Sequence, residues 1–146
     1  MQKWVLLIHI LGATIWTSGH LVLALTVLPR ALRARDPRVI QDFEAGYERL
    51  GMPALLVQIV TGLWLAYQYL PSPAAWFGFG SPVAVHIFVK LALLACTLAL
   101  AIHARLRVIP KLDADSLKVL AYHIVAVTIL SVLFVVVGSG FRFGGW

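Results

Sequence analysis

The stretch WVLLIHILGATIWTSGHLVLALTVL, residues 4–28, decides the fold. It contains no Asp, Glu, Lys or Arg, and a helix needs about 20 mainly apolar residues to cross a bilayer. The apolar core of a secretory signal peptide is shorter, about 7–15 residues. We therefore expect residues 4–28 to be a retained transmembrane helix.

Three further stretches have the same character, at residues 52–70, 82–103 and 119–137. Charged residues make up 12% of the chain, against roughly 25% in soluble domains. We expect an all-α integral membrane protein, an antiparallel bundle of four transmembrane helices in one domain, residues 1–146, with the lipid bilayer as its partner. The single cysteine, Cys96, excludes an internal disulfide and any multi-cysteine metal centre.

The basic residues that give the net charge of +6 gather in the first and third connections between these stretches. The positive-inside rule then places both connections in the cytoplasm and both termini outside, and this placement argues against a nucleic-acid partner. The second connection, residues 71–81, is uncharged and aromatic. It fits either a segment at headgroup level or an ordinary turn. Residues 38–50 have apolar side chains at helical spacing, which predicts a short amphipathic surface helix.

Four histidines match in pairs by depth. His9 and His20 are eleven positions apart, so they share one helix face and differ in height by about 16 Å. Counted from the middle of each stretch, His9 and His86 both lie about 10 Å toward the outside. His20 and His123 lie about 6 and 8 Å toward the cytoplasm. His103 lies beside the basic connection, where we expect a solvated interfacial residue.

An imidazole inside a membrane is costly, which makes each of these histidines a candidate functional residue. Two matched layers suit two metal or haem centres, with one axial imidazole from each of two facing helices. Histidines bonded to carbonyls or hydroxyls inside the bundle are the alternative. Methionine and cysteine are too few for a thioether relay of copper(I). Three glycines would leave room for a porphyrin: Gly12, Gly19 and Gly62.

Lys90 follows His86 by four positions and therefore lies on the same helix face. All six acidic residues of the chain lie in the predicted connections. Lys90 is therefore deprotonated, or reaches along a watery path to the surface, or meets an anion that the chain does not encode. A haem propionate or an anionic substrate would serve as that anion.

Several short motifs resemble the copper-resistance protein D (CopD) superfamily and the related HemJ-type protoporphyrinogen oxidases. They are WVLLIHILGATIW (4–16), LPR (28–30), VTGLWLA (60–66) and FVKL (88–91). By that resemblance His9 and Lys90 correspond to a haem-site histidine and lysine, whereas His86 lies two positions before the expected histidine. The segment around His20 resembles a bacterial CopD-like branch instead. The resemblance implies a bacterial inner membrane, and haem b or copper as ligand.

We interpret the sequence as a redox protein that holds two bis-histidine haems, His9 with His86 and His20 with His123. It would transfer electrons across the membrane, to or from quinone or a periplasmic redox partner. Three alternatives stay open. The same histidines would serve a copper transporter, a HemJ-like oxidase would hold one haem, and a structural membrane subunit would hold neither.

Overall fold

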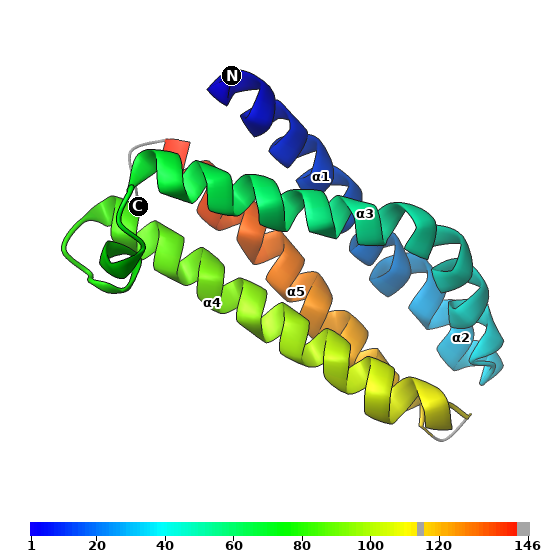
Figure 1. Ribbon diagram of the computed structural model, residues 1–146. Coiled ribbons are helices and arrows are strands. Elements are labelled where there is room, and N and C mark those ends of the chain that lie inside the picture. Colours follow the sequence, from blue (N-terminus) through cyan, green and yellow to red (C-terminus); the bar gives the residue numbers. More distant parts are fainter. Residues whose placement is uncertain (114–115, 143–146) are drawn as a thin grey trace.

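The computed structural model describes residues 1–113 and 116–142, with side chains through residue 140, and its regular elements are all helical (Figure 1). In chain order these elements are α1 (Gln2–Val22), η1 (Leu23–Val27), α2 (Leu28–Ala34), α3 (Arg38–Tyr69), η2 (Pro73–Phe77), α4 (Pro82–His103), η3 (Ala104–Val108), η4 (Ile109–Lys111) and α5 (Leu117–Arg142). The segments η1 and η3 are single π-helical turns, which continue the helices before them.

Four of the resulting helical units are long and apolar enough to cross a membrane: Gln2–Ala34, Arg38–Tyr69, Pro82–Lys111 and Leu117–Gly140. The expected all-helical fold with four candidate spans is confirmed. The first three units extend beyond the predicted stretches at their basic ends. Residues 38–50, predicted as a separate surface helix, are instead the first part of α3.

The bend in the first part of α3 has a local cause (Figure 1). Pro53 lies inside this helix. A proline has no backbone N–H to donate, and its ring crowds the carbonyl four residues earlier, so helices bend at such a position. The bend turns the polar beginning of α3 away from the line of its apolar remainder.

The four units do not form a closed bundle. Helix α1 packs against α3 and α5, and α4 packs against α5, but α3 and α4 hardly touch each other. Figure 1 shows α3 and α4 diverging from the connection that joins them. The core cluster of buried apolar residues lies between η1, α2, the beginning of α3 and the beginning of α5, and it includes Leu23, Leu28, Ile40, Leu117 and Leu120. One side of the bundle, between α3 and α4, is left open for cavities.

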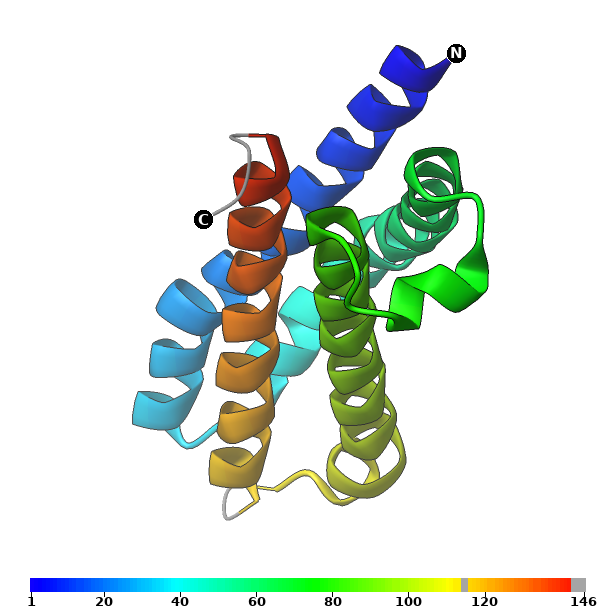
Figure 2. The ribbon, with the colours of Figure 1, turned by 90° about the vertical axis from the view of Figure 1, so that its left-hand side faces the viewer.

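The connections divide between two ends of the molecule (Figure 2). The N-terminus, η2 and the last turns of α5 lie at one end, which we call the terminal end. The turn between α2 and α3, the segment η4 and the first turn of α5 lie at the other, which we call the basic end. The basic residues of η3, η4 and α2 are at this second end.

Candidate functional site

Two cavities follow the open side of the bundle. The lysine pocket lies toward the terminal end, has a volume of about 460 Å³, and includes His9, Gln58, His86, Lys90 and Ser139 among its polar lining residues. The glutamate pocket lies toward the basic end, has a volume of about 490 Å³, and is lined by, among others, His20, Glu44, Glu48, Met52, Arg105 and His123. Both volumes fall within the range of about 300–1,000 Å³ typical of small-molecule sites.

The histidines matched by depth line the same cavities. His9 and His86 contribute to the wall of the lysine pocket, together with Lys90. His20 and His123 contribute to the wall of the glutamate pocket. Each pocket thus receives one imidazole from α1 and one from α4 or α5.

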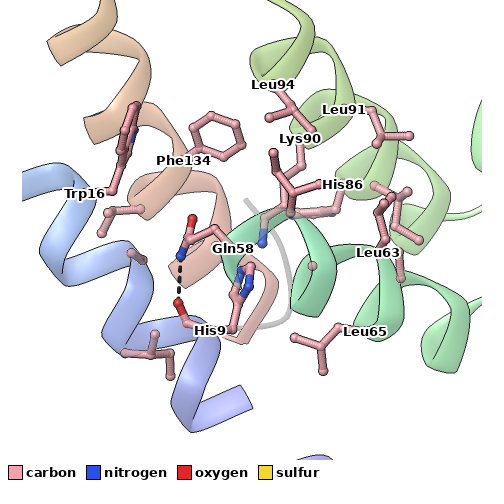
Figure 3. Close-up of a pocket in the computed structure, with 18 of the residues that line it drawn as sticks. His9, Trp16, Gln58, Leu63, Leu65, His86, Lys90, Leu91, Leu94 and Phe134 are labelled. Atoms are coloured by element: carbon pink, nitrogen blue, oxygen red, sulfur yellow. Dashed lines mark hydrogen bonds between the residues drawn. The ribbon is translucent and has the colours of Figure 1, made fainter. Parts of the chain in front are cut away.

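The ring of His9 is held in a defined orientation. Its Nδ1 lies 2.8 Å from the hydroxyl oxygen of Thr61, and that hydroxyl donates to the carbonyl oxygen of Val57 at 2.5 Å. Because the hydroxyl proton is used in that bond, Nδ1 of His9 must be the donor toward Thr61. The Gln58 side chain also donates to the His9 carbonyl oxygen at 2.6 Å (Figure 3). Nε2 of His9 is therefore the acceptor nitrogen, on a ring that lines the lysine pocket.

The other three histidines of the pockets have a common local geometry. In each, Nδ1 lies within hydrogen-bond distance of the carbonyl oxygen four residues earlier in the same helix: His20 to Trp16 at 2.9 Å, His86 to Pro82 at 2.8 Å and His123 to Val119 at 2.9 Å. A carbonyl oxygen only accepts, so Nδ1 carries the hydrogen and Nε2 is the acceptor nitrogen. Imidazoles that bind metals are commonly oriented by such a bond.

The structure adds a contact that the sequence did not predict. Nδ1 of His103 lies 2.8 Å from Nε2 of His123, and the two rings are parallel with centroids 5.0 Å apart. Since Nδ1 of His123 donates to Val119, its Nε2 accepts from His103. The contact was missed because the third stretch was expected to end at His103. The helix continues through η3 and η4, and this places His103 level with the first turns of α5.

The lysine pocket carries one kind of charge. Among its described lining residues, Lys90 is the only charged one. Its ammonium group extends from α4 toward the space between Gln58 and His9 (Figure 3), and a methyl group on Gly138 of α5 would lie 3.5 Å from it. In the described part of the chain Lys90 forms no ion pair. The rest of the wall is mainly apolar, so a protonated Lys90 gives the pocket a single positive charge.

The glutamate pocket has the opposite balance. Its charged lining residues are Glu44, Glu48 and Arg105, one positive charge against two negative ones. Arg105 and Glu48 form an ion pair at 3.2 Å, with side chains 68% and 48% exposed. The thioether of Met52 lies in the same wall. This pocket therefore offers imidazole, carboxylate and thioether groups, which are all ligands for a metal cation.

The three glycines expected near a cofactor face protein groups. Gly12 faces Gln58 and Ala54 of α3, and Gly62 faces the ring of His9. A Cβ atom at Gly19 would overlap the ring of Tyr47, whose hydroxyl donates to the carbonyl oxygen of Ile15 at 2.7 Å. These glycines let side chains and helices of the bundle approach one another closely.

Together the fold and the pockets define a multi-pass membrane protein, a four-helix assembly with histidines on three of its long helices. Residues 41–141, more than half of the chain, match the family described as copper resistance protein D (CopD). The chain therefore belongs to the CopD family, as its motifs suggested. The match includes His86, Lys90, His103 and His123 and begins after α1. No curated protein and no solved structure matches the chain.

Proposed function

We propose that the protein handles copper in the membrane, with the ion bound transiently at the His103–His123 pair beside the glutamate pocket. Membership of the CopD family supports the choice of metal. The observation that carries the proposal is the contact between the two rings, with nitrogens 2.8 Å apart on neighbouring helices. Two imidazoles that already meet would share a metal ion once their nitrogens move apart to admit it, since each metal–nitrogen bond is about 2 Å long.

The ion would replace the hydrogen bond between the rings. Copper would bind Nε2 of His123 and Nδ1 of His103, and the hydrogen of His103 would move to its own Nε2. The bond from Nδ1 of His123 to the Val119 carbonyl oxygen would then orient the ligand. The nearby carboxylates of Glu44 and Glu48 favour a cation in this region by charge.

The His103–His123 pair is better suited to the transfer of copper than to its storage. Among residues 1–113 and 116–140, no group of three or more His, Cys, Asp or Glu side chains gathers closely enough to hold a metal. A passage through a membrane requires binding that is strong enough to capture an ion and weak enough to release it. A pair of imidazoles, one of which, His123, lines the same pocket as Met52 and His20, would meet that requirement.

The proposed orientation follows from charge. The basic end carries the Arg and Lys residues of α2, η3 and η4, and such residues remain on the cytoplasmic side. The glutamate pocket would then lie near the cytoplasm and the lysine pocket near the outer surface, with both termini outside. Cysteine accessibility from each side of the membrane, measured at Gln2 and Arg107, tests this orientation.

Copper binding is tested with purified protein titrated with copper(I) against a competing chelator. His103→Ala and His123→Ala should each lower the affinity by about tenfold or more, because even an orienting partner of a ligand contributes that much. Lys118→Ala, an exposed basic residue at the same end, is the control and should leave the affinity unchanged. If both histidine variants bind copper as the wild type does, the proposed site is wrong.

Haem b is a second candidate, favoured by a different observation. Each mainly apolar pocket is lined by two histidines whose Nδ1 atoms are already engaged as donors. His9 with His86, and His20 with His123, would hold one haem each, and haem would supply one-electron transfer. The contact of His123 with His103 would have to open for this. A Soret band in the purified protein that His9→Ala diminishes would favour haem, and a colourless copper-binding protein would exclude it.

A further inference from the structure

We propose that the lysine pocket binds a single-chain amphiphile with a carboxylate head, taken up sideways from the lipid between α3 and α4. This inference goes beyond copper handling and concerns the other cavity. It combines an opening toward the membrane, an apolar wall and one cation.

The opening comes from the packing of the helices. The lysine pocket is lined by Gln58, Leu63 and Ala66 of α3 on one side and by His86, Lys90 and Leu94 of α4 on the other. These two helices hardly touch each other, and Figure 1 shows them diverging from η2. Leu63, in this wall, is 41% exposed. An apolar chain can therefore enter from the bilayer without separating packed helices.

The polar atoms in the pocket indicate which head group it would bind. The hydroxyls of Thr14, Thr17 and Ser139 donate to the backbone carbonyl oxygens of Ile10, Ser131 and Val136. Gln58 donates to the His9 carbonyl oxygen. Lys90, by contrast, forms no ion pair within the described residues, and its ammonium group extends into the pocket (Figure 3). Lys90 thus supplies a positive charge that the lining does not balance.

A cation that is partly buried among apolar side chains without a partner is costly, and an anion offsets that cost. A single ammonium group matches the single charge of a carboxylate, whereas phosphate sites commonly add the bidentate guanidinium of an arginine. No arginine lines this pocket among its described residues. The ligand would place its carboxylate at Lys90 and its chain along the apolar side chains of α3 and α4.

The experiment measures the binding of radiolabelled palmitate and of hexadecanol, which has the same chain and no charge, to the purified full-length protein. Lys90→Met should weaken palmitate binding about tenfold or more, because a charge-assisted hydrogen bond is lost, and should leave hexadecanol unaffected. Lys90→Arg should retain palmitate. Lys118→Met, exposed and outside the pocket, should behave as the wild type.

Thermal unfolding of each variant shows whether it is folded. If Lys90→Met does not fold, Lys90→Arg decides the test, because it keeps the positive charge and should still bind palmitate more tightly than hexadecanol. Equal affinity for palmitate and hexadecanol would overturn the proposal, as would normal palmitate binding by a folded Lys90→Met protein. A purified protein whose lysine pocket retains haem, with an absorption spectrum that changes in Lys90→Met, would also overturn it. The carboxylate would then belong to a haem propionate.

Discussion

The lysine pocket and the glutamate pocket are alike in size and in histidines but opposite in charge. Each has a volume of nearly 500 Å³ and two imidazoles in its wall. One contains Lys90 without an acid, and the other contains two glutamates with one arginine. Two cavities that each contain two histidines therefore differ in the charged groups that line them. The charged residue beside the histidines decides whether a cation or an anion is favoured.

Reversal of the charge in the lysine pocket should produce the largest change. In Lys90→Glu, a carboxylate joins His9 and His86 around one cavity, which creates a set of ligands suited to a metal. We expect the copper retained per chain to increase and palmitate binding to be lost. Lys118→Glu is the control, because it adds the same charge outside both pockets. Unchanged copper binding in Lys90→Glu would show that charge does not distinguish the pockets.

The wall of the glutamate pocket depends on a glycine in α1. A Cβ atom at Gly19 would overlap the ring of Tyr47, and this ring also stacks on Phe43 with centroids 5.7 Å apart. Gly19→Ala should force α1 and α3 apart and lower the free energy of unfolding by about 1–3 kcal/mol. Nothing lies within 4 Å of a Cβ atom at Gly46.

Gly46→Ala is therefore the matched control, and it should stabilise α3 by about 0.5–1 kcal/mol through helix propensity. Chemical unfolding in detergent, with the two variants side by side, measures both effects. A Gly19→Ala protein as stable as Gly46→Ala would mean that Tyr47 does not occupy the space beside α1.

Removal of the hydrogen bond that orients His9 in the lysine pocket should have a smaller effect than the changes at Lys90 and Gly19. Thr61→Val removes the hydroxyl that accepts from Nδ1 of His9, and loss of one such bond costs about 1 kcal/mol. Because the ring would then be free to rotate, a ligand at its Nε2 should bind more weakly. Thr14→Val is the control, because the Thr14 hydroxyl bonds only to its own helix. Nitrogen NMR shifts of the His9 ring show which of its two nitrogens carries the hydrogen, and they should change in Thr61→Val.

The long apolar units and their antiparallel order could be predicted from hydropathy because the bilayer fixes the length of a spanning helix. Depth along a helix follows from its rise, and His9 and His86 do line one cavity. The contact between His103 and His123 could not be predicted in this way. It depends on the helical continuation Ala104–Lys111, a basic segment that hydropathy assigns to a loop.

The open side of the bundle could not be predicted from the sequence either. Hydropathy measures how apolar a helix is and says nothing about which neighbour it touches. That α3 and α4 diverge depends on how α1 packs between α3 and α5 and on contacts such as Gly19 with Tyr47. Of the glycines expected to make room for a porphyrin, Gly62 and Gly19 line the two pockets. All three also have a side chain of the bundle beside the space that a Cβ atom would take, because a glycine leaves space without specifying what fills it.

The smallest effect is expected at the ion pair of the glutamate pocket. Arg105 and Glu48 are 68% and 48% exposed, and exposed pairs contribute roughly 0–1 kcal/mol. Arg105→Gln should therefore hardly change the free energy of unfolding. It should, however, release Glu48 and leave the pocket with two uncompensated carboxylates. Copper should therefore bind a few times more tightly at low salt, and this difference should disappear as the salt concentration increases. Arg107→Gln, which removes an equal charge from the same turn outside the pocket lining, is the control. Equal copper affinities for these two variants would mean that the glutamates do not contribute to the capture of copper, and the contrast between the two pockets would then reduce to the single charge of Lys90.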